Sequence, residues 1–135
     1  MASRRREVII ADKAPKAIGP YSLGILTQGL IFTSGTIGVD PGTGDFVPGG
    51  IEAETRQALE NIANILAGGG SSLKSVVKTT VFMRDLSDFS KMNAVYAEYF
   101  GDDPPARSTI QVARLPKDAA IEIEAIAVVG EAHGD

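Results

Sequence analysis

The stretch Ile121-Glu122-Ile123-Glu124-Ala125-Ile126-Ala127 decides the fold, because apolar residues occupy every odd position and acidic ones begin the even positions. Side chains along a strand point to opposite faces with a period of two. The odd positions are therefore predicted to face helices. Glu122 and Glu124 share the other face with Ile126 and Val128. This predicts a sheet covered by helices on one face only.

Working outward from that strand, the chain alternates strand-like and helical patterns. Apolar, β-branched runs predict strands, and a stripe with a period near 3.6 predicts a helix. The expected strands are 8–10, 22–27, 30–39, 75–83, 106–113 and 121–129. The expected helices are 51–67 and a second helix that is capped by Ser87 or Asp88 and ends before Gly101. Gln28-Gly29 and Leu115–Asp118 are predicted to close hairpins. The order predicts an α+β fold, a mixed sheet with two helices on one face.

The length of 135 residues predicts one domain spanning 1–135, with flexible ends at 1–6 and 131–135. The chain has no cysteine, which excludes a disulfide, a thiolate metal site and a cysteine nucleophile. Its one histidine, His133, excludes a multi-histidine zinc site. We expect no metal and no cofactor.

The net charge of −4 disfavours a broad nucleic-acid surface. The basic cluster Arg4-Arg5-Arg6 is interpreted as a solvated terminus, with a short nucleic-acid arm as the alternative. Apolar runs are too short to span a membrane, and a secretory signal is not visible. These features predict a cytoplasmic protein, with an organelle such as the mitochondrion as the alternative.

The last two strands are predicted to be neighbours and to present polar residues on one surface. That surface would carry Arg107, Thr109, Gln111, Glu122 and Glu124. One interpretation is a pocket between subunits, in which the planar guanidinium binds a carboxylate and Glu122 activates water. The isoleucines beside Glu122 face away from it, so a raised pKa would have to come from an interface. The alternative is a solvated face with an Arg–Glu cross-strand pair.

Several segments together resemble the reactive intermediate deaminase (RidA, or YjgF) family along nearly the whole chain. The matching segments are Ala17-Ile18-Gly19-Pro20-Tyr21-Ser22, Thr33-Ser34-Gly35, Val77–Val81, Pro105-Ala106-Arg107-Ser108, Val112–Lys117 and Ile121–Ala125. Their order and spacing make the resemblance specific. It implies a chorismate-mutase-like fold of the bacillus type, assembled as a homotrimer around a central barrel, with pockets between subunits. It also implies hydrolysis of enamines and imines such as 2-aminoacrylate to 2-keto acids, without a cofactor.

The resemblance assigns three catalytic residues. Arg107 is similar to the carboxylate-binding arginine of the family, Glu122 to its water-orienting acid, and Tyr21 to its pocket tyrosine. A structural alternative for Tyr21 is an anchor for the turn after Gly19-Pro20.

It also assigns substrate-binding roles to Ser34, Gly35, Asn93 and Thr109. Many relatives carry cysteine where Thr109 stands, so thiol-based regulation is absent here. Ser34-Gly35 has the alternative of a strand bulge, and Asn93 that of a polar residue at the core edge.

Two rival functions stay open from the sequence. One is a ligand-binding or regulatory trimer without turnover. The other is an endoribonuclease-type inhibitor of translation, which the resemblance to this broad fold implies. The acidic charge speaks against RNA as a ligand.

Overall fold

The computed structural model describes residues 5–130, and all strands in that range belong to one sheet. The strands are β1 (Glu7–Val8), β2 (Gly24–Thr27), β3 (Leu30–Thr33), β4 (Thr36–Ile37), β5 (Val76–Met83), β6 (Ala106–Gln111) and β7 (Ile121–Val128). The helices are α1 (Gly50–Gly68) and α2 (Phe89–Phe100), and short 3-10 turns occupy Leu73–Ser75, Leu86–Asp88 and Pro116–Asp118.

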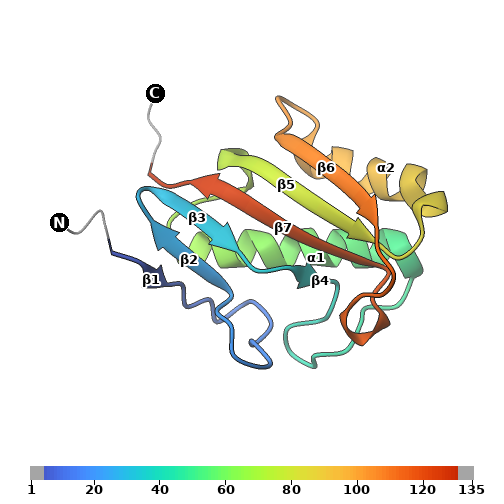
Figure 1. Ribbon diagram of the computed structural model, residues 1–135, viewed down its shortest axis with the longest axis horizontal. Coiled ribbons are helices and arrows are strands. Elements are labelled where there is room, and N and C mark those ends of the chain that lie inside the picture. The colour runs from blue at the N-terminus through green and yellow to red at the C-terminus, as the bar shows by residue number, and fades with distance from the viewer. Residues whose placement is uncertain (1–4, 131–135) are drawn as a thin grey trace.

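The sheet runs in the order β1-β2-β3-β7-β5-β6, and β4 continues the β3 side along β7. The pair β5–β6 is parallel and the other pairs are antiparallel. In Figure 1 both helices lie behind the sheet, and neither covers the face toward the viewer. The predicted α+β fold, with a mixed sheet and two helices on one face, is confirmed.

β7 lies inside the sheet, and its residues alternate between a buried and a more exposed face as predicted. Ile121, Ile123, Ala125 and Ala127 are all buried, whereas the residues between them are partly or fully exposed. The buried set lies against α1, whose own stripe is Leu59, Ile62 and Leu66. We call the uncovered side, which carries Glu122 and Glu124, the open face. Burial of the apolar set is what fixes this register, because a slip by one residue would invert both faces.

The predicted helix boundaries hold to within a residue or two, but the predicted cap of the second helix is wrong. Asp88 stands before the first turn of α2 without making a capping hydrogen bond. Asp85 instead accepts a hydrogen bond from the backbone N–H of Ser87, at 2.9 Å, and so caps the 3-10 turn that precedes α2.

The hairpin at Gln28-Gly29 is confirmed. Both residues have positive φ angles, 54° and 76°, as a type I′ turn requires. Glycine takes this conformation without steric cost, and Thr27 pairs directly with Leu30 across the turn.

The hairpin predicted between β6 and β7 is wrong. β5 lies between these strands: it pairs with β6 on one side and β7 on the other. The segment Leu115–Asp118 is therefore a crossover that contains a 3-10 turn. Its sequence carries turn signals, but turn signals do not reveal which strand the chain joins next.

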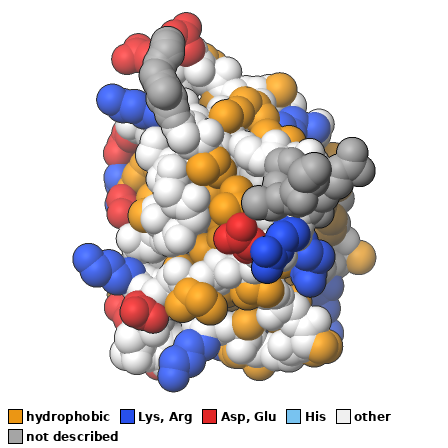
Figure 2. Space-filling model, turned by 90° about the vertical axis from the view of Figure 1, so that its left-hand side faces the viewer, with side chains coloured by type: hydrophobic (Ala, Val, Ile, Leu, Met, Phe, Trp, Pro, Cys, Tyr) orange, Lys and Arg blue, Asp and Glu red, His pale blue; other side chains and the backbone are white. Residues whose placement is uncertain are grey.

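The ends predicted to be flexible lie largely outside the described residues, since 1–4 and 131–135 are not described. His133 also falls there. Among the described helices, neither is both long and apolar enough to cross a membrane. Figure 2 shows the end of the molecule at the left of Figure 1, where apolar side chains reach the surface between charged ones.

Candidate active site

Glu122 lies on β7 at a break in the neighbouring strand. Phe32 of β3 pairs with Ile126, and Thr36 of β4 pairs with Ile123. From Phe32 to Thr36 the chain advances four residues, whereas from Ile126 to Ile123 it advances three. The β3–β4 side therefore has one extra residue, which forms a bulge at Ser34-Gly35. The bulge expected as the structural alternative is present, and it lies beside Glu122. Bulges of this kind re-aim side chains next to active sites.

Gly35 permits the close approach of that bulge to Glu122. A Cβ atom added at Gly35 would lie 2.6 Å from Cδ of Glu122. A real Cβ atom cannot approach that closely, so glycine is required for this carboxyl orientation. The predicted role of Gly35 as a contact residue thus has a steric basis.

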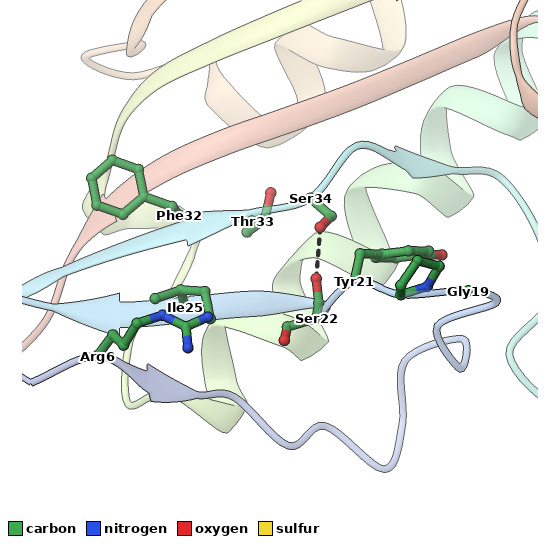
Figure 3. A pocket seen from close by; sticks show the side chains of 9 residues that line it. Arg6, Gly19, Tyr21, Ser22, Ile25, Phe32, Thr33 and Ser34 are labelled. Carbon is green, nitrogen blue, oxygen red and sulfur yellow. Dashed lines mark hydrogen bonds between the residues drawn. The ribbon is translucent and has the colours of Figure 1, made fainter.

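Ser34 and Tyr21 are held beside the bulge by backbone contacts. Ser34 Oγ donates to the carbonyl of Ser22 at 2.6 Å, and the backbone N–H of Ser34 donates to the carbonyl of Leu23. The Tyr21 hydroxyl accepts from the N–H of Ile18 at 3.3 Å, so the turn-anchor alternative also has support. Figure 3 shows Tyr21 next to Ser34 and the dashed bond from Ser34 to Ser22.

A cavity of about 700 Å³ joins these residues. Tyr21, Ser34, Gly35 and Glu122 all line it, so four predicted site residues come together in one chain. Apolar side chains form much of the remaining wall, and Lys117 of the crossover lies at one side, where its Nζ donates to the carbonyl of Gly44 at 3.0 Å. We call this group the acid half of the site.

The carboxyl of Glu122 is perturbed within the single chain. Burial raises the pKa of Glu122 above its ordinary value, and the like charge of Glu124 on the same face raises it further. The expectation that a raised pKa must come from an interface is therefore wrong. A pKa moved toward neutrality suits a group that both accepts and returns protons.

Arg107 lies on β6, and its guanidinium is held by α2. Nη1 donates to Oδ1 of Asn93 at 2.7 Å. The guanidinium carbon lies 4.6 Å from the ring centroid of Tyr96 and 5.5 Å from that of Phe89. Because Asn93 contacts one nitrogen only, other donors of the planar guanidinium are available for an anion. Asn93, to which the resemblance assigns substrate binding, therefore lies beside Arg107.

Thr109 lies two residues along β6 from Arg107 and shares its face. Its buried hydroxyl is without a hydrogen-bond partner among the described residues. An unpaired buried hydroxyl is costly and commonly marks a place where a ligand or water binds. Asn93, Arg107 and Thr109 form what we call the cation half of the site.

The two halves do not meet within one chain, which corrects the predicted common surface. Arg107 pairs with Thr79 of β5, and Thr79 pairs with Ala125 on the helix-covered face. Glu122 pairs with Phe82 on the open face. Strand spacings put the two backbone positions about 10 Å apart along the strands and about 10 Å across them, on opposite faces. The assignment of Thr109 and Gln111 to the open face is wrong for the same reason.

Two residues that contact Arg107 were not predicted as site residues from the sequence. Phe89 and Tyr96 received no site role from the sequence, yet both rings face the guanidinium. With Asn93 they occupy positions i, i+4 and i+7 of α2, one helix face. That spacing was a visible signal. Residues 5–130 contain no cluster of three or more histidine, cysteine or acidic residues able to hold a metal.

Comparisons with known proteins find relatives that match nearly the whole chain. The family model described as Endoribonuclease L-PSP matches residues 11–129. The bovine 2-iminobutanoate/2-iminopropanoate deaminase is 50% identical over 130 residues, which are 96% of this chain and 95% of the bovine protein.

Solved structures are similar over the same range. The YjgF gene product of Escherichia coli has a TM-score of 0.86 at 46% identity, covering 90% of this chain and 98% of its own. Escherichia coli TdcF with bound serine has a TM-score of 0.87 at 44% identity, covering 92% and 99%.

Proposed function

The chain belongs to the reactive intermediate deaminase family, whose model carries the description Endoribonuclease L-PSP, and on that premise we propose that it hydrolyses 2-imino acids. Substrates such as 2-iminopropanoate and 2-iminobutanoate would yield 2-keto acids and ammonia. Relatives with about half of their residues identical bear the name of this activity, and one relative binds serine, a small molecule with the same carboxylate.

One observation carries the proposal. A guanidinium with free donors and a half-buried carboxyl of raised pKa lie in one chain, at a bulge and a helix that hold them in fixed positions. A substrate with a carboxylate at one end and an electrophilic imine carbon at the other needs both groups. The two groups lie on opposite faces, so a complete site requires the acid half of one copy and the cation half of another.

The proposal therefore includes a homotrimer with a central barrel and with pockets between copies. The open face supports it, because Phe32, Ile110 and Val128 are 42%, 45% and 44% exposed there in the isolated chain. Such exposure of large apolar groups on one face is typical of an assembly surface. A second copy packed on this face would cover them and bring a cation half beside an acid half. Light scattering would then give three times 14.1 kDa, about 42 kDa.

Binding begins at Arg107. Its planar guanidinium donates two parallel hydrogen bonds to the substrate carboxylate, while Asn93 holds one of its nitrogens. The substrate C2 then lies near the carboxyl of Glu122 of the neighbouring copy. Holding both reactants in this way supplies part of the rate enhancement by orientation alone. The Thr109 hydroxyl and the acid-half groups Ser34 and Tyr21 are placed to contact the rest of the substrate.

Hydrolysis of the imine then follows in two steps, the addition of water and the loss of ammonia. An enamine first tautomerises to the imine by moving a proton from nitrogen to C3. Glu122, in its ionised form, takes a proton from water as the water oxygen bonds to C2, and the imine nitrogen takes a proton from solvent, which is given back when the hydroxyl proton is released in the next step. The resulting aminoalcohol loses ammonia: the C2–N bond breaks, the hydroxyl proton is released, and Glu122 returns its proton to the leaving nitrogen. The products are a 2-keto acid and ammonia.

A coupled assay tests this function. A pyridoxal-phosphate dehydratase generates 2-aminoacrylate from serine, and pyruvate and ammonia release are followed with and without the protein. We expect acceleration by the wild type, and a Glu122→Gln variant with kcat lowered about a hundredfold and KM little changed. Release at the uncatalysed rate with wild-type protein would refute the proposal.

RNA cleavage is the second candidate, favoured by the description of the family model alone. The same preparation should be incubated with labelled RNA. Cleavage that survives both Arg107→Ala and a further purification step would favour this alternative. A cytoplasmic location also stays part of the proposal and is checked by fractionation of the source cells.

A further inference from the structure

Tyr96 is the residue in closest aromatic contact with Arg107, and nothing in the proposed reaction uses it. The guanidinium carbon lies 4.6 Å from the centre of its ring. The side chain of Tyr96 is only 5% exposed, and burial raises the pKa of its hydroxyl, so the ring stays neutral. A cation at this distance over a neutral aromatic face is attracted by the quadrupole of the ring.

The Tyr96 ring is itself fixed from two sides. Its hydroxyl shares a hydrogen bond of 2.7 Å with Oγ1 of Thr79, a buried residue of β5. Phe100 lies one turn further along α2 with its ring centre 4.7 Å from that of Tyr96. Thr79 is also the backbone partner of Arg107. The residue beside Arg107 in the sheet thus holds the ring that faces the guanidinium.

This arrangement differs from ordinary core packing. Tyr99, three residues along the same helix, also hydrogen bonds through its hydroxyl, but to Glu60 of α1 at 2.9 Å and away from β6. Of these two tyrosines, only Tyr96 both hydrogen bonds to a buried residue of the sheet and presents its ring to the guanidinium. Asn93 accepts a hydrogen bond from one nitrogen of Arg107, and the Tyr96 ring lies 4.6 Å from the guanidinium carbon.

We infer that Tyr96 is a positioning residue for the carboxylate of the substrate: tethered to Thr79, its ring orients the guanidinium of Arg107 for two-point binding of the anion. The inference rests on the proposed function, since it takes Arg107 as the carboxylate-binding group. It adds a specific requirement at position 96, namely an aromatic face, with the hydroxyl as a secondary support.

The test compares Tyr96→Leu, which removes the ring, with Tyr96→Phe, which keeps the ring and loses the tether. Pyruvate serves as the carboxylate probe, and its Kd is measured by titration. We expect Tyr96→Leu to weaken pyruvate binding about tenfold and to raise KM more than it lowers kcat. Tyr96→Phe should stay within about twofold of the wild type. Tyr99→Leu is the matched control and should leave the Kd unchanged.

A second readout does not depend on any ligand. In ¹⁵N-labelled protein the Nε–H signal of Arg107, identified by its loss in Arg107→Lys, should carry a ring-current shift. The shift should persist in Tyr96→Phe and become clearly smaller in Tyr96→Leu, in which the more distant Phe89 ring, 5.5 Å away, remains. Should the leucine variant fail to fold, Tyr96→Met, whose flexible side chain fills irregular gaps, replaces it in both arms.

The outcomes separate the two proposals. Equal pyruvate affinity in the wild type and Tyr96→Leu would overturn the role of Tyr96 while leaving the deaminase proposal standing. Weakened binding by Tyr96→Phe and Tyr96→Leu alike would also overturn it, because the aromatic face would not matter. Wild-type protein that neither binds pyruvate nor hydrolyses imines would instead overturn the proposed function.

Discussion

The acid half and the cation half of the site are built by different means. Glu122 is positioned by backbone geometry: a bulge in the neighbouring strand and a glycine that leaves room for the carboxyl. Arg107 is positioned by side chains of α2, through Asn93 and two aromatic rings. The first half therefore tolerates almost no added volume, whereas the second depends on the chemistry of a few side chains. Each prediction below tests one side of this difference.

Removing the cation should have the largest effect. Arg107→Ala deletes the charge-assisted hydrogen bonds to the substrate carboxylate, so we expect kcat/KM for 2-iminopropanoate to fall about a thousandfold. The trimer should persist, because the proposed contact between copies rests mainly on the exposed apolar side chains of the open face. Arg56→Ala, which removes a surface partner of Glu98, is the control and should keep full activity. A kinetically normal Arg107→Ala would eliminate the cation half as a binding site.

Adding one methyl group to the acid half should have the second largest effect. Gly35→Ala places a Cβ within 2.6 Å of Cδ of Glu122 and displaces the carboxyl. We expect kcat to fall by about a hundredfold, since small misplacements of a catalytic group are costly. In a Glu122→Gln background the same substitution should have little further effect, because its target is already gone. Additive losses would show that Gly35 acts on something other than Glu122.

A smaller effect is expected when the support of the cation is removed. Asn93→Ala deletes the acceptor for Nη1 of Arg107, and we expect KM to rise about tenfold with kcat changed less. The control is Asn64→Ala on α1, whose side chain donates to the carbonyl of Lys13 at 3.4 Å and lies outside the site. Asn93→Ala with a normal KM would mean that the rings alone hold the guanidinium.

The smallest effect concerns stability and pH. Burial raises the pKa of Glu122 in the folded chain, so the unfolded chain loses this proton at lower pH than the folded chain does. The free energy of unfolding therefore falls as pH rises through that interval. Glu122→Gln should be slightly more stable than the wild type at neutral pH and equal to it in acid, as measured by Tm at both pH values. The same difference in Tm between variant and wild type at both pH values would mean that burial does not disfavour the ionised carboxyl of Glu122.

The sequence predicted the structure correctly where the pattern depends on neighbouring residues. The alternation of β7 predicted its two faces, and the apolar stripe of α1 predicted its buried side. The hairpin at Gln28-Gly29 was predicted from two strand-like runs separated by a turn that contains glycine. In each case the signal comes from residues close together in the sequence, so it does not depend on which distant strands pair.

The sequence failed where pairing over long distances decides the outcome. Taking β6 and β7 for a hairpin put Arg107 on the face of Glu122, whereas the insertion of β5 and its parallel pairing with β6 put it on the other. The shared face of Arg107, Thr109 and Gln111 was predicted correctly, but its direction was not. The juxtaposition of Gly35 and Glu122 likewise depends on a strand pairing nearly ninety residues apart, and only the family resemblance pointed to it.

Mixing two inactive variants tests the central claim most directly. Arg107→Ala and Glu122→Gln chains, unfolded together and refolded at equal amounts, should form trimers in which a sound acid half of one chain meets a sound cation half of the other. Random assembly makes about a quarter of the pockets intact, so we expect about a quarter of wild-type imine hydrolysis. Activity no higher than that of the separate variants would contradict a site shared between copies.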